Sequence, residues 1–431
     1  MLKLKNIFFG KKILIYGLGK SGISSYNFLK DKADVYLFDD NLNIKAKINK
    51  KFISKKKIFQ IEFDKIILSP GIDISNCKLS KFLKINFSKI YTDLDVFYSF
   101  YKNDCITITG TNGKSTTCKL LYEILSDQKF DVKLGGNIGK PILSVKNVKP
   151  KTIFVIEASS YQLEYSKIFK SKFSVILNIS PDHIERHKTF DRYVEAKFKL
   201  LKNQIKGNTA FVKKDDHNIN KKLKSNKLKS NIIKVNTKKI DLLIKRLDNK
   251  YFFTDTNKEN LSFVLAISKK LNLKRNLLKD TIKNFKGLKY RQQVIYKRNN
   301  LTVINDSKST SFSSSIALLK NYSNIYWLLG GIYKKKDKLN LQKKYFKNIK
   351  AFIFGKNQSF FIKKLKGKIK FQSFYNLDAA IKKIFSLIKK DKLNDKTILF
   401  SPCAASFDSF KNFEDRGLYF NKSIKRYLNG L

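Results

Sequence analysis

Cysteine, methionine and tryptophan are scarce in this sequence. Its 431 residues include 4 cysteines, 1 methionine and 1 tryptophan, and no two cysteines form a Cys-x-x-Cys pair. Cys105, Cys118 and Cys403 lie in or beside motifs and are typical of small buried residues in a reducing cytosol. No apolar run approaches the ~20 residues that span a bilayer, and Lys11 and Lys12 interrupt the stretch that a signal peptide would need. These absences predict a cytoplasmic protein without membrane insertion.

Acidic residues are also few, since 34 Asp and Glu stand against 90 Lys and Arg, a formal net charge of +56. Such a charge ordinarily indicates nucleic acid or an anionic membrane surface. Here the lysines are spread over the whole chain, and no RNP-like aromatic motif, zinc-finger spacing or basic-region heptad accompanies them. We interpret the excess as a drift toward A/T-rich codons, which other proteins of the same organism would share, and expect no nucleic-acid partner.

What the sequence does contain is a phosphate-binding pattern. Residues 109–116 read TGTNGKST, after a β-type run at 105–108 and before a helical pattern. Glycine-turn N–H groups and a helix N-terminus bind phosphates, Lys114 would neutralise their charge, and Ser115 would ligate Mg²⁺. The general pattern has glycine where this chain has Ile108, so a chance glycine-rich turn is the alternative. The flanking strand and helix favour an ATP site made by Gly110, Thr111, Asn112, Gly113, Lys114, Ser115 and Thr116.

A second glycine turn lies near the N-terminus. Residues 17–22 read GLGKSG after an expected strand at 12–16, and a further strand at 35–38 ends at Asp39. This order is typical of a Rossmann-type turn, with a pyrophosphate on the glycines and Asp39 on a ribose or uracil group. The motif does not separate NAD, FAD and a UDP-sugar, and a tight turn without ligand is the alternative.

Polar residues follow two expected strands of the middle part. The strand at 152–156 leads to Glu157, and the strand at 174–177 leads to a loop with His183, one of 3 histidines. Carboxyl ends of adjacent parallel strands meet at one edge, so Glu157 is a candidate Mg²⁺ ligand, or else an acid at a helix N-terminus. His183 is interpreted as functional, with a structural role as the alternative.

Three further segments of the middle part leave their chemistry open. Lys197 falls on the apolar stripe of an expected helix at 189–201, where a buried amine is costly, but lysine is abundant throughout. Residues 208–250 are rich in Lys and Asn and are expected to hold short strands and exposed loops. The segment 256–260 opens a helix, and a charged, solvated face is the simplest interpretation of it.

The last part predicts a second Rossmann-like sheet. Three expected strands end in small or charged residues, NDSKST at 305–310, LLGG at 328–331 and SPCAAS at 401–406, which favours an anion-binding edge. With strand and helix patterns alternating throughout, the sequence predicts an α/β fold with mostly parallel sheets.

The order of these motifs resembles the Mur ligase family. The resemblance spans the chain and also rests on GNIG at 136–139, EASSYQL, NISPDHIERH, EAK at 195–197, YR at 290–291 and SPCAASFDSFKNFEDRG at 401–417. It implies three domains: a Rossmann-like domain for the UDP part of the substrate at 1–95, a central P-loop ATPase domain at 96–286, and a Rossmann-like domain for the amino acid at 287–431.

The resemblance also implies a reaction, and the motifs favour the member of the family that adds D-glutamate. ATP would phosphorylate the carboxylate of UDP-N-acetylmuramoyl-L-alanine, and the amine of D-glutamate would attack the acyl phosphate, giving ADP, phosphate and an amide for peptidoglycan. Because the first step joins two anions, charge stabilisation would be the main catalytic effect. The protein would be a cytoplasmic monomer with two Mg²⁺ ions.

Site residues follow from the resemblance. Lys197 would react with CO₂ to give a carbamate, which with His183 would help to hold the second Mg²⁺. The catalytic residues would be Lys114, Glu157, His183 and Lys197, and the metal ligands Ser115, Glu157, His183 and carbamylated Lys197. Further ATP contacts would be Asn257, Arg291 and Asp306. The UDP contacts would be Lys20, Ser21, Asp39, Ser69, Pro70 and Gly71; Asn137 and His183 would lie near the reacting end; D-glutamate would meet Lys308, Thr310, Lys334, Ser406 and Phe413.

Other interpretations remain. A sister ligase is the nearest, although the L-alanine-adding member usually has His in place of Asn112, and folylpolyglutamate synthases lack the N-terminal domain. This chain also departs from the family at Thr256 and Tyr290, where His is frequent, and at Asp40 and Asn41. A nucleic-acid-dependent ATPase, or an NAD-dependent oxidoreductase fused to a kinase-like domain, would leave the C-terminal motifs unexplained.

Overall fold

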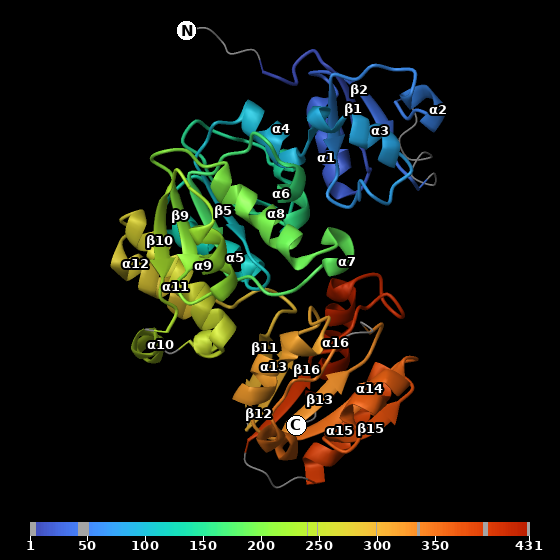
Figure 1. Cartoon of the computed structure of the whole chain (residues 1–431). Coiled ribbons are helices and arrows are strands. Elements are labelled where there is room, and N and C mark those ends of the chain that lie inside the picture. Colours follow the sequence, from blue (N-terminus) through green and yellow to red (C-terminus); the bar gives the residue numbers. More distant parts are fainter. Residues whose placement is uncertain are drawn as a thin grey trace. The chain divides into compact units, whose positions relative to one another are not determined.

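The computed structural model describes residues 6–41, 51–238, 240–247, 249–298, 300–333, 337–390 and 395–428. They form three sheets flanked by helices (Figure 1), and every pairing between named strands is parallel except that of β11 with β12. The predicted fold class is therefore confirmed. The chain divides into two compact units, Met1–Leu243 with Glu259–Ile282, and Ile244–Lys258 with Lys283–Leu431. The domain boundaries at 95 and 286 stay predictions.

The N-terminal sheet has the order β2-β1-β3-β4. Its central strand β1 is apolar and buried after its first residue, as expected for a parallel strand that is covered on both faces. The predicted strand 12–16 has the predicted bounds, and the predicted strand 35–38 begins one residue earlier, at Asp34. The elements are β1 (Lys12–Tyr16), α1 (Lys20–Leu29), β2 (Asp34–Phe38), α2 (Lys55–Ile58), β3 (Lys65–Leu68), α3 (Ser80–Ile85) and β4 (Ile90–Tyr91).

The middle sheet has the order β10-β9-β8-β5-β7-β6, which places β5 between β8 and β7. Its strands are β5 (Cys105–Thr109), β6 (Val132–Gly136), β7 (Ile153–Glu157), β8 (Phe173–Ile176), β9 (Thr209–Lys213) and β10 (Asn231–Val235). Its helices are α4 (Asp93–Phe100), α5 (Lys114–Asp127), α6 (Ser160–Tyr165), α7 (Ile184–His187), α8 (Phe190–Lys202), α9 (His217–Lys224), α10 (Asp241–Leu247), α11 (Asp255–Lys270) and α12 (Arg275–Asn284).

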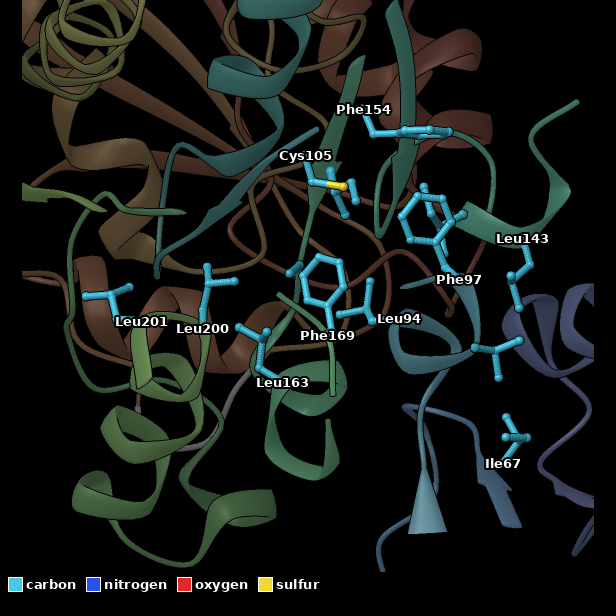
Figure 2. Packing of buried hydrophobic residues seen from close by; sticks show 14 of the residues in the cluster. Ile67, Leu94, Phe97, Cys105, Leu143, Phe154, Leu163, Phe169, Leu200 and Leu201 are labelled. Carbon is cyan, nitrogen blue, oxygen red and sulfur yellow. The ribbon is translucent and has the colours of Figure 1, made fainter. Parts of the chain in front are cut away.

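One hydrophobic cluster packs helix α4 against this sheet. Figure 2 shows Leu94, Phe97, Phe154 and Phe169 gathered there, and the rings of Phe97 and Phe154 meet edge to face at 4.8 Å. Such aromatic burial contributes a few kcal/mol per side chain, about 1.5–3 each. This packing fixes helix α4 against the sheet whose strands carry the candidate site. The expectation for residues 208–250 was incomplete, because α9 and α10 lie there besides two strands.

The C-terminal sheet has the order β11-β12-β16-β13-β14-β15, with hydrophobic clusters on both faces. Trp327 is fully buried in β13, and Cys105, Cys118 and Cys403 are buried as predicted. Within the described ranges, no helix has the length and apolarity that crossing a membrane requires. The elements are β11 (Gln293–Arg298), β12 (Leu301–Asn305), α13 (Phe312–Asn321), β13 (Ile325–Leu329), β14 (Ile349–Phe354), α14 (Gln358–Leu365), β15 (Lys370–Phe374), α15 (Leu377–Lys390), β16 (Lys396–Phe400) and α16 (Phe413–Leu428).

Candidate active site

The phosphate-binding turn joins β5 to α5, as the sequence predicts. Gly113 precedes the helix with φ 85°, a conformation that side chains other than glycine rarely adopt. A Cβ at this position would also lie 2.0 Å from Oδ1 of Asn260. The turn therefore needs glycine, and the backbone N–H groups at the start of α5 lie where an anion is stabilised.

Asn178, at the exit of β8, fixes the shape of this turn. Its Oδ1 accepts a hydrogen bond from the backbone N–H of Asn112 at 2.9 Å, and its Nδ2 donates to Glu259. Glu259 in turn forms an ion pair with Lys213. Glu259 is buried, so the interpretation of residues 256–260 as a solvated face is wrong. The sequence analysis assigned no role to Asn178 or Glu259, although Asn178 stood at a predicted strand end.

Lys114 lies over the turn, as its motif requires. Its Nζ donates to the carbonyl oxygens of Gly110 at 2.8 Å and Thr111 at 2.9 Å, while the Ser115 side chain is buried beneath. The hydroxyl of Thr111 lies 3.0 Å from that of Tyr193 on α8. The amine and the turn thus form one unit that can receive phosphate oxygens.

Glu157 is a buried carboxylate at the end of β7. It is 2% exposed; its Oε1 accepts a hydrogen bond from Nδ2 of Asn137 at 2.7 Å, and its Oε2 is buried without a hydrogen-bond partner. Helix α6 begins later, at Ser160, and has no acid in its first turn, so the alternative of a helix N-terminal acid is wrong. A buried anionic oxygen without a partner is costly unless a cation meets it, and this oxygen therefore fits Mg²⁺.

Lys197 points from α8 at the phosphate-binding turn. It is 2% exposed, and its Nζ donates to the Gly110 carbonyl at 2.9 Å and lies 4.6 Å from the ring centroid of Tyr193. Burial, and then the nearby charge of Lys114, hold the pKa of this amine well below its usual value. The high lysine content of the chain does not explain why the amine of Lys197 is buried. An amine with a lowered pKa is more often neutral, and a neutral amine can act as a nucleophile.

His183 and His187 differ in exposure. His183 precedes α7 with φ 53°, its side chain is 42% exposed, and its ring centroid lies 5.1 Å from that of Tyr161. His187 is buried, with Nε2 2.9 Å from Oγ of Ser160, and burial lowers its pKa to about 4. The structural role considered for His183 therefore describes His187, and His183 is accessible to a substrate.

The N-terminal turn is closely packed. Gly17 has φ 93°, and a Cβ at Gly22 would lie 1.8 Å from the Gly17 carbonyl oxygen. The Ser69 hydroxyl donates to that same oxygen at 2.6 Å, and the Asp39 carboxylate accepts from the backbone N–H of Leu18 at 2.5 Å. Four predicted UDP contacts are partly or fully exposed around this turn, namely Lys20, Ser21, Pro70 and Gly71. The structure brings the predicted set together and gives Asp39 the further role of holding the turn.

The predicted ATP contacts of the second unit meet at Gln292, to which the sequence analysis gave no role. Asn257 donates to Oε1 of Gln292 at 3.2 Å, and the Gln292 backbone N–H donates to Oδ1 of Asp306 at 3.1 Å. Asp306 is buried, its Oδ2 accepts from the Ser401 hydroxyl at 2.8 Å, and burial raises its pKa to about 7. Arg291, directly before Gln292, favours the charged carboxylate.

The three motif-bearing strand exits of the C-terminal sheet lie together. The backbone groups of Ile332 and Ala405 pair at 2.9 and 2.8 Å, which joins the exits of β13 and β16. Nζ of Lys308, after β12, lies 3.9 Å from the ring centroid of Phe413. Ser406 is buried and Thr310 is half-buried at the same edge; Lys334 lies outside the described residues. The predicted amino-acid contacts therefore share one edge.

A family model described as the Mur ligase middle domain matches residues 108–279. The UDP-N-acetylmuramoylalanine--D-glutamate ligase of Rickettsia felis is 35% identical over 447 residues, covering 97% of each chain. The ligase of the same name from Rickettsia prowazekii is 35% identical over 453 residues, covering 98% of this chain and 99% of its own.

A solved structure supports the fold. MurF from Thermotoga maritima in complex with ADP superimposes with a TM-score of 0.57 at 15% identity, covering 87% of this chain and 91% of its own. A phosphate-binding loop, a buried carboxylate and a buried lysine in such a fold define a Mur-type ligase, and the chain belongs to the Mur ligase family. Within that family, the two full-length relatives named above are D-glutamate ligases.

Proposed function

We propose that this protein is an ATP-dependent ligase that joins D-glutamate to UDP-N-acetylmuramoyl-L-alanine through an acyl phosphate, in the synthesis of peptidoglycan precursors. Two observations beside the phosphate-binding turn carry the proposal. The Glu157 carboxylate, whose residue pairs with Ile108 of β5, has a buried oxygen without a hydrogen-bond partner, and the buried Lys197 amine donates to Gly110. The acceptor follows from relatives that bear this activity in their names and cover nearly the whole chain.

ATP and Mg²⁺ would use the edge of the middle sheet. The described residues include no cluster of three or more His, Cys, Asp or Glu side chains suited to a metal. This agrees with Mg²⁺, which is usually held by one or two carboxylates together with substrate phosphates. Glu157 and the buried Ser115 would hold the ion, which when bound neutralises phosphate charge. Lys114 and the N-terminus of α5 would stabilise the negative charge that develops between carboxylate and γ-phosphate.

Lys197 would serve as a carbamate. Its lowered pKa favours the neutral amine, whose lone pair can form a bond with the carbon of CO₂ while one proton leaves to solvent. The product is an anion beside the turn, which together with His183 would help to hold a second Mg²⁺. This use accounts for a buried lysine whose Nζ hydrogen-bonds Gly110 and lies by Thr109.

We assign the remaining binding residues to three ligands: the UDP substrate, ATP and D-glutamate. The N-terminal turn with Lys20, Ser21, Asp39 and the 69–71 loop would hold the uridine diphosphate, and Asn137 and His183 the reacting end of the substrate. Asn257, Arg291 and Asp306 would contact ATP. The cationic and hydroxyl groups of Lys308, Thr310, Lys334 and Ser406, with Phe413, would hold the two carboxylates of D-glutamate. We infer a cytoplasmic monomer without a nucleic-acid partner.

Phosphate release from ATP tests the proposal. Purified protein, Mg²⁺ and UDP-N-acetylmuramoyl-L-alanine would be supplied in turn with D-glutamate, L-glutamate, other amino acids or single-stranded DNA. We expect release with D-glutamate alone, together with a matching gain in mass of the UDP substrate. Release with another amino acid would move the assignment to a sister ligase, and release driven by DNA without either substrate would contradict it.

A further inference from the structure

One buried guanidinium connects the three strand exits that the acceptor site would use. Arg416 lies in the first turns of α16 and is 1% exposed. Its Nη2 donates to the Ser307 carbonyl at 2.8 Å and to the Ala404 carbonyl at 2.9 Å, and its Nε lies 3.1 Å from the Ser307 hydroxyl. A Cβ on Gly331 would lie 3.2 Å from its Nη1, so the β13 exit also approaches the guanidinium.

The arrangement is costly for stability alone. All acceptors of the Arg416 hydrogen bonds are neutral oxygens, and its Nη1 is buried without a hydrogen-bond partner. Burial lowers the pKa of the group to about 10, so it stays charged at neutral pH. The nearby carboxylates of Asp408 and Asp306 favour the charged guanidinium, but the three hydrogen bonds described above all go to neutral oxygens, so the cost of burying this cation is offset only in part. Such a residue needs a reason beyond packing.

The residues that Arg416 holds lead directly to the predicted acceptor contacts. Ser307 precedes Lys308 and donates from its hydroxyl to the Phe413 carbonyl at 2.9 Å. Lys308 and Phe413 form the cation–π pair, and Ala404 lies two residues before Ser406. Nη2 of Arg416 fixes the two backbone carbonyls while Nε fixes the Ser307 hydroxyl, and the planar guanidinium holds all three bonds in one geometry. The amine of a lysine could reach the carbonyls but has no second nitrogen for the hydroxyl.

We propose that Arg416 is a positioning residue for the acceptor amino acid: it locks the β12, β13 and β16 exits into the arrangement that binds the two carboxylates. This inference rests on the proposed function. It predicts that loss of the fork weakens acceptor binding more than ATP binding, because Lys114 and Ser115 lie on another sheet and, of the proposed ATP contacts, Asp306 directly precedes a residue that Arg416 holds.

The test compares Arg416→Lys, which keeps the charge and loses the fork, with Arg426→Met, an exposed arginine on the same helix. For each variant the KM for D-glutamate, ATP and the UDP substrate is measured, with the emission of Trp327 as a check on folding. Trp327 is suitable because it is the single tryptophan, and its Nε1 donates to the Ser401 carbonyl at 2.9 Å.

We expect Arg416→Lys to raise the KM for D-glutamate about tenfold or more, since small misplacements of binding groups have effects of this size, with a smaller rise in the KM for ATP and the KM for the UDP substrate within about twofold. Arg426→Met is expected to match the wild type. An unchanged KM for D-glutamate would overturn the inference. So would a rise of all three KM values with altered Trp327 emission, because the role would then be merely structural.

Ser307→Ala provides a second route if the Arg416 variants do not fold. It removes the acceptor of the Arg416 Nε–H and leaves the guanidinium, so we expect a smaller rise in the KM for D-glutamate alone; no rise would contradict the inference. If the wild-type protein instead uses another amino acid, the proposed acceptor fails, and the same comparison made with that amino acid still decides the role of Arg416.

Discussion

The middle sheet and the C-terminal sheet each have one proposed ligand-binding edge, and each edge buries one acid and one base. These are Glu157 and Lys197 on the middle sheet, and Asp306 and Arg416 on the C-terminal sheet. The two edges differ in how the acid is hydrogen-bonded. In the middle sheet, Glu157 has an oxygen without a hydrogen-bond partner. In the C-terminal sheet, both oxygens of Asp306 accept hydrogen bonds, from Gln292 and Ser401. The acid of the first edge thus has an oxygen free to meet a cation, whereas the acid of the second edge has both oxygens hydrogen-bonded. Substitutions at the first should therefore affect chemistry, and at the second binding or stability.

The largest expected effect concerns Lys197. We expect Lys197→Ala to lower kcat by about 10³-fold, since it removes a group that would organise charge at the transferred phosphate. A short carboxylic acid added to this variant should restore part of the rate by replacing the carbamate anion. The measurement is phosphate release with and without acetate, and Lys202→Ala on the same helix, an exposed lysine, is the control. Loss without any rescue would argue against a carbamate.

Glu157→Gln comes next. We expect about a 10²-fold loss of activity and a higher Mg²⁺ concentration for half-maximal rate, because a metal ligand loses its charge. Thermal stability without nucleotide should not fall, since the substitution removes a buried charged oxygen that has no partner. A Mg²⁺ titration beside a melting curve tests both parts. A lower melting temperature with an unchanged Mg²⁺ requirement would indicate a structural acid instead.

The sequence predicted the strands that lead to motifs, because parallel strands are continuous apolar runs whose polar exits stand out. The run 12–16 matches β1, the run 35–38 matches β2 within one residue, and the helix predicted at 189–201 matches α8 within one residue. Helix α9 was missed because lysine and asparagine surround its two apolar residues, Ile219 and Leu223. Helix α10 was missed because its seven residues are too few to show a helical period. Glu259 and Arg416 could not be assigned roles from the sequence. Their hydrogen-bond partners lie 81 and 109 residues away in the chain, and no rule of sequence spacing predicts such contacts.

At the second edge, the stability of the fold should depend on Asp306. Its pKa of about 7 lies above the ordinary 3.8, so the folded state holds a proton that the unfolded state releases. The resulting stabilisation is complete below about pH 4 and is lost as the pH rises to 7. Asp306→Asn should therefore be more stable than the wild type at pH 8, by up to about 4 kcal/mol, and by less at pH 5. Urea unfolding followed at Trp327 measures both values, and a gap that does not widen with pH would contradict the expectation.

The smallest expected effect is at His187, beside the first edge, where the sign is reversed. Its pKa of about 4 lies below the ordinary 6.5. Between pH 4 and pH 6.5, His187 is therefore protonated in the unfolded state and neutral in the folded state. Stability should be complete above pH 6.5 and decline toward pH 4, by at most roughly 3 kcal/mol. His187→Gln can still meet the Ser160 hydroxyl and should flatten this decline without changing activity at pH 8. An equal acid sensitivity of variant and wild type would place the titrating group elsewhere, and because Glu164 also faces His187 at 3.8 Å, Glu164→Gln is the variant to compare next.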